Sequence, residues 1–451
     1  TLPLYVRPLM NGKRRLKMKQ LTRLFIPICL ETLFYMLSGM VDTLMLSAVG
    51  DYAVGAVGTA NSYIGIFIIM FSIISSGMVS VMTQNIGAGR PGVAYQARQL
   101  GLLFNAVAGV LMAVFLFSGA GAILRMVGIA DALYEPALIY LKIVGGGCIL
   151  NAVIPNFSSY LRAFGYTKQP LYATIVGNIA NFVMNAVFLF VLHKGVAGVA
   201  AATVISKILN LCIVLYFSHK LISAKNSTER IANKTVLGQI VKVGLPSACE
   251  TALYNVAMML VIRFLNQMDA EGLNVTARSY TATISNFSYC VGAALAQANA
   301  IMTGWHIGAG ELEECDRGTK RAAFVGVCVA VCMETAIVLG SGFIMPLFTD
   351  NPEMTALVRK LLAIDIVLEI GRVTNLVFGQ ALKTSGDAVF PAVIAAVFMF
   401  VFAVGGTWLF GISMGLMAVG AYIGLASDEC VRAVGMVWRW KTGKWRTKKL
   451  V

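Results

Sequence analysis

Residues 52–89 read YAVGAVGTANSYIGIFIIMFSIISSGMVSVMTQNIGAG and contain no Asp, Glu, Lys or Arg. A helix that crosses the hydrocarbon core of a bilayer needs about 20 mostly apolar residues. Residues 388–427, near the other end of the chain, form a second stretch without these charged residues. Both stretches are continuously apolar, whereas transmembrane β-strands alternate in units of about ten residues. The two stretches therefore predict membrane-spanning α-helices.

The composition of the whole chain agrees with this prediction. Of the 451 residues, 58% are hydrophobic and 13% are charged, and the mean hydropathy is +0.77. Soluble domains have about 45–50% apolar and about 25% charged residues. The excess excludes a soluble enzyme, and it excludes a nucleic-acid-binding module despite the net charge of +15. The nine cysteines include no CxxC pair, so they do not indicate a disulfide framework or a zinc site.

Turn signals divide the chain into twelve predicted spans, which makes it an all-α polytopic membrane protein. The spans are 21–47, 53–82, 94–118, 132–156, 170–192, 196–217, 236–266, 277–303, 318–343, 356–382, 389–410 and 415–438. Most of the 36 Lys and Arg residues then fall on one side of the membrane together with both termini. The positive-inside rule makes that side the cytoplasm. We expect a multi-pass protein of the plasma (inner) membrane, whose basic residues also attract anionic lipids.

An internal repeat relates the two halves of the chain. The matches are Pro27, Glu31, Thr32 and Tyr35 with Pro246, Glu250, Thr251 and Tyr254; residues 86–89 with residues 307–310, both Ile-Gly-Ala-Gly; and Leu161, Arg162, Gly165 and Pro170 with Leu382, Lys383, Gly386 and Pro391. Six spans in each half make the repeat parallel, an arrangement found in alternating-access transporters. The prediction is an N-lobe (1–218), a basic cytoplasmic linker (219–235) and a C-lobe (236–451). Two similar lobes favour a carrier over a channel or a receptor.

Ionisable residues at membrane depth are the first functional candidates, because inserting one costs about 2.5–3.5 kcal/mol. Asp42 lies in the first span and has no basic residue near it in sequence. Its carboxylate must be protonated, bind a cation, or meet a partner from another helix. Asn178, Asn181 and Asn185 share one face of the fifth span, and Thr203 adds a hydroxyl in the sixth. Such an oxygen-only set of single negative charge suits Na⁺ or a proton, although the same side chains could simply hydrogen-bond helices together.

The residues Val41-Asp42-Thr43, the turn at 86–89 and the pair Asn181 and Asn185 resemble the multidrug and toxic compound extrusion (MATE) family of cation-coupled efflux carriers. The resemblance covers essentially the whole chain. It implies a coupling site for H⁺ or Na⁺ made of Asp42, Asn181, Asn185 and Thr203, closer to the DinF-like than to the NorM-like pattern. It also implies a helix-1 hinge at Pro27.

The C-lobe departs from the NorM-like pattern, in which a Glu of helix 7 and an Asp of helix 10 take part. Glu250 lies about one turn before the expected Glu, and Glu369 can pair with Arg372 three residues later. A self-neutralised pair is less suited to binding a cation. The residues expected to line a substrate cleft are Tyr35, Asn178, Glu250, Tyr254, Glu369 and Arg372. Asp428 and Glu429 are expected to form a local salt-bridge cluster with Arg432, and Glu334 has no evident partner.

The predicted function is secondary active efflux of amphipathic, often cationic, drug-like compounds in antiport with H⁺ or Na⁺. No Walker A pattern is present, so an ion gradient must supply the energy. We expect no enzymatic activity, no cofactor, no nucleic-acid partner, and a functional monomer in the lipid bilayer. The alternatives are a lipid-linked-sugar flippase of the same superfamily, or a membrane receptor or channel.

Overall fold

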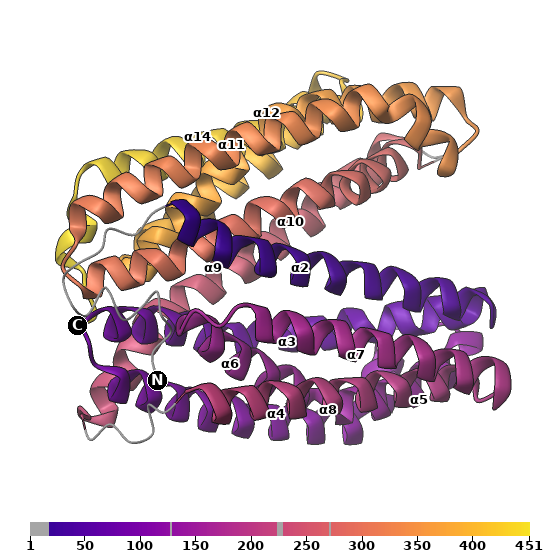
Figure 1. Ribbon diagram of the computed structural model, residues 1–451. Helices are drawn as coiled ribbons and strands as arrows, with labels where there is room; N and C mark the ends of the chain where they lie inside the picture. The colour runs from indigo at the N-terminus through magenta and orange to yellow at the C-terminus, as the bar shows by residue number, and fades with distance from the viewer. Residues whose placement is uncertain (1–17, 127–128, 223–228, 270–271) are drawn as a thin grey trace. The chain divides into compact units, whose positions relative to one another are not determined.

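The computed structural model describes residues 18–126, 129–222, 229–269 and 272–451 (Figure 1). Within these ranges every regular element is helical. The basic N-terminal residues 1–17 and residues 223–228 of the predicted linker lie outside the described residues. The prediction of an all-α polytopic membrane protein is confirmed.

The described helices group into twelve segments that match the twelve predicted spans in order. They are α2 (Met18–Ser47), α3 (Asp51–Gly87), α4 (Pro91–Met126), the pair α5 (Asp131–Gly146) and α6 (Cys148–Ala163), α7 (Lys168–Ala186) with η1 (Val187–Val191), α8 (Gly195–Leu221), α9 (Asn233–Met268), α10 (Leu273–Gly308), α11 (Leu312–Ile344), α12 (Pro352–Ser385), α13 (Val389–Phe398) with η4 (Met399–Val404) and η5 (Thr407–Ser413), and α14 (Met417–Lys441). The fourth predicted span is a pair of helices bent by 41°.

Length and hydropathy alone qualify seven of the described helices as membrane spans, or eight if the bent pair counts as one span. The helices α12 and α14 do not qualify, and both carry buried ionisable residues in their middle parts. Such residues in otherwise apolar helices are typical of functional positions in membrane proteins.

The chain forms two compact units. The first contains Thr22–Gly244, and the second contains Leu245–Val451 together with the start of α2 up to Leu21. In the first unit α4 packs against α3, α5 and α6, and α7 packs against α8. In the second unit α12 packs against α10, α11 and α14, and α11, α12 and α14 run alongside one another (Figure 1). Each unit has its own apolar core, built largely from Ala, Val, Leu and Ile side chains.

The internal repeat extends to the geometry of the turns. The two Ile-Gly-Ala-Gly segments end α3 and α10, and the last glycine of each, Gly89 or Gly310, has a φ of 77°. The N–H of Gly89 donates to the carbonyl of Ile86 at 3.1 Å, and the N–H of Gly310 donates to the carbonyl of Ile307 at 3.1 Å. Glycine takes this left-handed conformation without the steric cost of a Cβ atom. Both Ile-Gly-Ala-Gly segments therefore end helices in the same way.

Two glycines allow α3 and the first part of α9 to approach closely within the first unit. A Cβ atom on Gly77 of α3 would lie 1.9 Å from the carbonyl oxygen of Ile240. A Cβ atom on Gly244 of α9 would lie 1.8 Å from the carbonyl oxygen of Ile73. Both obstacles are backbone atoms of helices, which cannot rotate away as a side chain can. Small residues permit this kind of contact between membrane helices.

We therefore expect Gly244→Val to destabilise the protein by about 1–3 kcal/mol or more, because overpacking forces the two backbones apart. The midpoint of thermal denaturation in detergent, followed by size-exclusion chromatography, measures this effect. Gly238→Ala on the same helix is the control, because a Cβ atom there meets nothing within 4 Å. Equal midpoints for the two variants would contradict the proposed packing.

Candidate functional site

The polar residues predicted in the first unit come together between α2 and α7. The side-chain amide of Asn185 donates to Asp42 Oδ1 at 2.8 Å and to Asn181 Oδ1 at 3.1 Å. Asn181 and Asn185 are both buried. They lie one helical turn apart on α7, so both amides face α2. Three of the four predicted site residues thus form one hydrogen-bonded chain.

The fourth predicted residue, Thr203 of α8, joins this group indirectly. Its hydroxyl donates to the carbonyl of Val199 within its own helix at 2.9 Å. Its side chain also interacts with the buried hydroxyl of Tyr140 on α5, which interacts with Asn61 and acts electrostatically on Asp42. No hydrogen bond between Thr203 and Asp42 occurs in the described part of the chain. Sequence reasoning missed Tyr140 because nothing in the sequence aligns α5 with α8.

A positive charge also belongs to this group. Lys207 lies one turn after Thr203 on α8, and its ammonium donates to Asn151 Oδ1 of α6 at 2.8 Å. The Lys207 charge acts electrostatically on Asp42. The sequence places Lys207 inside a span, which is the signal that could have identified it. The sequence indicated a site of single negative charge, and in the fold Lys207 of another helix acts electrostatically on the carboxylate of that site.

We define the N-site as Asp42, Tyr140, Asn151, Asn181, Asn185, Thr203 and Lys207. Its oxygen atoms are those of a carboxylate, three amides and two hydroxyls, which suit hard cations or a proton. The amide oxygen of Asn185 is buried and has no hydrogen-bond partner among the residues that the structure describes, so a lone pair is available to a ligand. No group of three His, Cys, Asp or Glu side chains arranged to hold a metal occurs among the described residues.

Polar contacts attach α2 to neighbouring helices at several positions along its length. Glu31 forms an ion pair with Arg162 of α6, and the amide of Asn178 donates to the carbonyl of Phe34 at 2.9 Å. Asp42 contacts Asn185 further along the helix. Pro27 lies inside α2, one turn before Glu31. A proline removes one backbone hydrogen bond of the helix and leaves a point at which the helix can bend.

The repeat-related residues of the second unit form the same kind of ion pair. Lys383 of α12 lies 2.7 Å from Glu250 of α9, just as Arg162 pairs with Glu31 in the first unit. Glu250 follows Pro246 by one turn. The sequence matched these acids and bases individually, and the fold shows that they are partners. In each half, the first helix of the repeat contains a proline, and an ion pair one turn after this proline attaches the helix to another helix of the same unit.

We expect Lys383→Glu to destabilise the second unit by about 1–3 kcal/mol, between the effects of breaking exposed and fully buried ion pairs. The double variant Glu250→Lys with Lys383→Glu should recover most of the loss, because opposite charges then face each other again. Thermal denaturation in detergent measures both effects. Arg317→Glu is the matched control, because Arg317 pairs with Glu314 at 3.2 Å but is exposed. Failure of the double variant to recover would contradict a direct pair.

A larger ionic cluster lies inside the second unit. Arg372 pairs with Glu369 and, at 3.6 Å, with Glu429. Arg432 lies 2.7 Å from Asp428 and 2.9 Å from Glu429. The predicted pairing of Glu369 with Arg372 and the predicted cluster around Arg432 are both confirmed. However, Arg372 is shared between two carboxylates, so Glu369 and Arg372 are not the isolated, self-neutralised pair that the sequence indicated.

Two more carboxylates adjoin this cluster without an ion pair. Glu334 of α11 is fully buried, and neither of its oxygens has a hydrogen-bond partner of normal geometry within the described residues. Asp365 of α12 is also buried, and its Oδ2 has no hydrogen-bond partner in the described ranges. Acids therefore outnumber bases here, and the low-dielectric interior must keep some of the carboxyl groups protonated or bring a cation to them.

A cavity of about 280 Å³ opens beside this cluster. Its lining includes Tyr254, Arg278, Tyr289, Asp365, Arg372, Tyr422 and Asp428. Of the six residues predicted to line a cleft, Tyr254 and Arg372 line this cavity. Glu369 is fully buried against Arg372, Glu250 pairs with Lys383, Asn178 binds α2, and Tyr35 is 72% exposed. Which of the six residues line a substrate cleft beyond this cavity stays a prediction.

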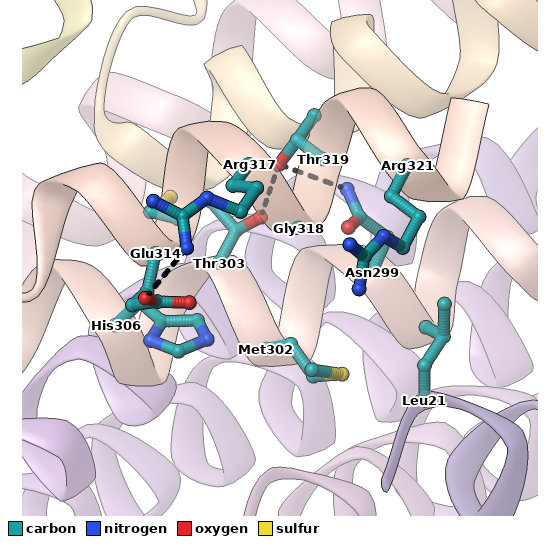
Figure 2. Close-up of a pocket in the computed structure, with 11 residues that line it drawn as sticks. Leu21, Asn299, Met302, Thr303, His306, Glu314, Arg317, Gly318, Thr319 and Arg321 are labelled. Atoms are coloured by element: carbon teal, nitrogen blue, oxygen red, sulfur yellow. Dashed lines mark hydrogen bonds and ion pairs between the residues drawn. The ribbon is translucent and has the colours of Figure 1, made fainter. Parts of the chain in front are cut away.

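A second, smaller cavity lies between α10 and α11 (Figure 2). The hydroxyls of Thr303 and Thr319 lie 3.4 Å apart at its wall, and the amide of Asn299 donates to the Thr319 hydroxyl at 3.5 Å (Figure 2). Its volume is about 40 Å³, whereas sites for drug-sized ligands measure about 300–1,000 Å³. This cavity can hold water but not an organic substrate.

Comparison with known proteins identifies the family of this chain. The MatE family model matches residues 27–187 and residues 246–409, so it matches each half of the repeat once. Over 428 residues, 94% of both chains, the sequence is 32% identical to a Bacillus subtilis (strain 168) protein named "Uncharacterized transporter YisQ". It is 20% identical to the "Probable multidrug resistance protein NorM" of Thermotoga maritima, over 96% of this chain and 94% of that protein.

The fold agrees with the sequence comparisons. A solved structure described as the outward-facing conformation of a multidrug resistance MATE family transporter aligns with a TM-score of 0.84 at 21% identity, over 99% of both chains. At this identity the likeness concerns the fold alone. The family match is independent of it and covers both halves of the chain. The protein belongs to the MatE family and is a membrane-embedded transporter rather than an enzyme.

Proposed function

We propose that this protein is a secondary active multidrug efflux transporter that exports amphipathic organic cations in antiport with H⁺ or Na⁺. The observation that carries the proposal is the N-site, in which the Asp42 carboxylate accepts a hydrogen bond from the buried amide of Asn185. Asn181 and Thr203 supply further oxygen atoms. Binding a cation or a proton to Asp42 neutralises its charge, and neutralisation removes most of the cost of burying a carboxylate.

Neutralisation of Asp42 is coupled to movement of α2 in this proposal. A neutral carboxyl group accepts weaker hydrogen bonds than a carboxylate, so the contact between Asp42 and Asn185 weakens. Helix α2 can then repack, and Pro27 serves as the hinge at which it bends. Ion binding shifts the equilibrium between the two conformations of α2, and the size of the shift equals the difference between the ion's binding free energies for these conformations. The ion-bound state is the one that releases the substrate outside.

The membrane context of the proposal follows from charge distribution. The excess of Lys and Arg on one side orients both termini toward the cytoplasm in the plasma membrane. The N-lobe (1–218) and the C-lobe (236–451) both take part in the alternating-access cycle, and Tyr254 and Arg372 contribute to the substrate path from the cavity of the second unit. The protein works as a monomer, needs no cofactor, and has lipid and small organic cations as its partners.

Counterflow in proteoliposomes tests this function. Purified protein is reconstituted, a fluorescent organic cation such as ethidium is added, and a Na⁺ or H⁺ gradient is imposed across the membrane. Antiport predicts uphill movement of the dye driven by one of the two gradients. Movement only down the dye gradient would indicate a channel, and transport of a lipid-linked sugar instead of the dye would indicate a flippase.

A further inference from the structure

The cavity of the second unit has charged groups of both signs in its wall. Its charged lining residues are Arg278 of α10, Asp365 and Arg372 of α12, and Asp428 and Glu429 of α14. Three of them are held by ion pairs, because Arg372 pairs with Glu429 and Arg432 pairs with Asp428 and Glu429. Ion pairing compensates these three charges inside the protein. The other two, Arg278 and Asp365, carry opposite charges.

Arg278 forms no ion pair with any residue that the structure describes. Its Nη2 atom donates to the thioether sulfur of Met258 at 3.8 Å, and Met258 lines the same cavity. A thioether is an uncharged, weak acceptor, so it does not compensate a guanidinium. The planar fork of N–H donors in a guanidinium matches the two oxygens of a carboxylate. Arg278 is therefore suited to receive a carboxylate from a ligand in the cavity.

Asp365 is the matching group of negative charge. It is 2% exposed, and within the described ranges its Oδ2 atom accepts no hydrogen bond. No described basic side chain, that of Arg278 included, lies within ion-pair distance of it. A buried carboxylate needs a positively charged partner, and an ammonium group supplies both the charge and three N–H donors. Asp365 is therefore suited to receive an ammonium group from a ligand.

Three aromatic rings complete the wall of the cavity, namely those of Tyr254, Tyr289 and Tyr422. Tyr422 is buried, and Arg278 and Asp365 both act on it electrostatically, so its ring lies near both charges. Aromatic side chains favour contact with another ring. The cavity volume of about 280 Å³ lies just below the range of about 300–1,000 Å³ for sites of drug-sized ligands. The cavity therefore suits a small aromatic compound.

Building on the proposed transport function, we propose that this cavity binds small aromatic zwitterions, such as aromatic amino acids, as a further class of substrate. The carboxylate of the zwitterion pairs with Arg278, its ammonium group pairs with Asp365, and its ring packs against Tyr422. An organic cation without a carboxylate is repelled by Arg278, and an organic anion is repelled by Asp365. A zwitterion compensates both charges at once, so the cavity selects it over either singly charged analogue.

Isothermal titration calorimetry of the purified full-length protein tests the proposal without requiring transport. Free tryptophan should bind saturably to the wild type. Tryptophan methyl ester keeps the ammonium group but lacks the carboxylate, and N-acetyltryptophan keeps the carboxylate but lacks the ammonium group. Each analogue should bind about tenfold to hundredfold more weakly than tryptophan, because each loses a hydrogen bond between charged groups. Leucine, a zwitterion without a ring, should also bind more weakly than tryptophan.

Two substitutions assign the two ends of the zwitterion. Arg278→Gln should weaken tryptophan binding about tenfold to hundredfold, and this variant should no longer prefer tryptophan to its methyl ester. Asp365→Asn should weaken tryptophan binding to a similar extent and remove the preference over N-acetyltryptophan. Arg263→Gln is the matched control, because Arg263 is an exposed arginine of α9, and it should bind tryptophan like the wild type. Gel filtration shows whether each variant is folded.

Two results would overturn the proposal. One is the absence of saturable tryptophan binding by the wild type. The other is a methyl ester that binds the wild type as tightly as tryptophan does, because Arg278 would then contribute nothing. Failure of the antiport proposal has a different signature, namely no uphill movement of ethidium by the wild type while tryptophan and its analogues bind in the expected order.

Discussion

Substitution of Asp42 by Asn is expected to abolish drug export while leaving expression and folding intact. The substitution preserves the shape of the side chain, and the oxygen of the new amide can still accept the hydrogen bond that Asn185 donates at 2.8 Å. What it removes is the ability to change charge. If the export cycle depends on neutralising this carboxylate, the neutral amide holds the N-site permanently in one protonation state. Transport should then fall to the level of cells that lack the protein.

The measurement is the minimal inhibitory concentration of ethidium in a strain without its own efflux pumps, together with the amount of protein in the membrane. Asp131→Asn is the matched control, because Asp131 is an exposed acid at the start of α5. That variant should confer the same resistance as the wild type. Wild-type resistance from Asp42→Asn at equal expression would remove Asp42 from the coupling mechanism.

The largest effect on stability is expected from substitution of Arg372 by Met. The guanidinium of Arg372 is the shared partner of Glu369 and Glu429, which are 0% and 7% exposed. Methionine occupies a similar volume but leaves both carboxylates without this partner. Removing one side of a buried ion pair costs about 3–5 kcal/mol, because an uncompensated charge stays inside the protein. Proton uptake by the carboxyl groups can reduce this cost but also perturbs the cluster.

A charge-balanced double variant separates the loss of charge compensation from the loss of packing. In Arg372→Met with Glu369→Gln, one acid is removed along with the base, and most of the stability should return. Arg359→Met controls for the loss of an arginine from the same helix, because Arg359 is exposed. Thermal denaturation of the purified proteins in detergent gives the order: wild type and Arg359→Met highest, the double variant next, and Arg372→Met lowest. A single variant as stable as the double variant would argue against charge compensation by Arg372.

The family match supports the internal repeat. Two matches to the same family model, one in each half, agree with the repeat of Pro27 and Glu31 as Pro246 and Glu250. Glu31 and Glu250 form ion pairs with Arg162 and Lys383. In both halves, therefore, an ion pair attaches the first helix of the repeat to another helix of the same unit. The two halves differ in their polar interiors. The N-site of the first half has one acid and one lysine together with amides, whereas the described ionic cluster of the second half has more acids than arginines.

Much of the candidate site was predictable because it depends on spacing along single helices. Asn181 and Asn185 are one turn apart on α7, so they had to share a face. Glu369 and Arg372, and likewise Asp428 and Arg432, lie within one turn of each other, and their ion pairs form as predicted. The spans could be located because about 20 apolar residues in a row have few alternatives to a membrane helix.

The sequence could not show which helices touch. Lys207 and Asp42 lie on helices far apart in the chain, and no pattern along either helix reveals that both face one site. The sharing of Arg372 between Glu369 and Glu429 likewise depends on the packing of α12 against α14. Glu334 had no evident partner in the sequence, and among the described residues it forms no ion pair, although Asp365, Glu369 and Arg372 act on it electrostatically.

The sequence by itself determined the twelve predicted spans, the repeat, the local ion pairs and which acidic residues lie at membrane depth. These properties follow from periodicity and from the cost of placing charge in an apolar medium, both of which act over short stretches of chain. The tertiary structure alone decided the charge balance of each polar cluster, because electrostatic energy depends on distances in space. It placed Lys207 within electrostatic reach of Asp42, and it gave the described ionic cluster of the second unit more buried carboxyl groups than arginines.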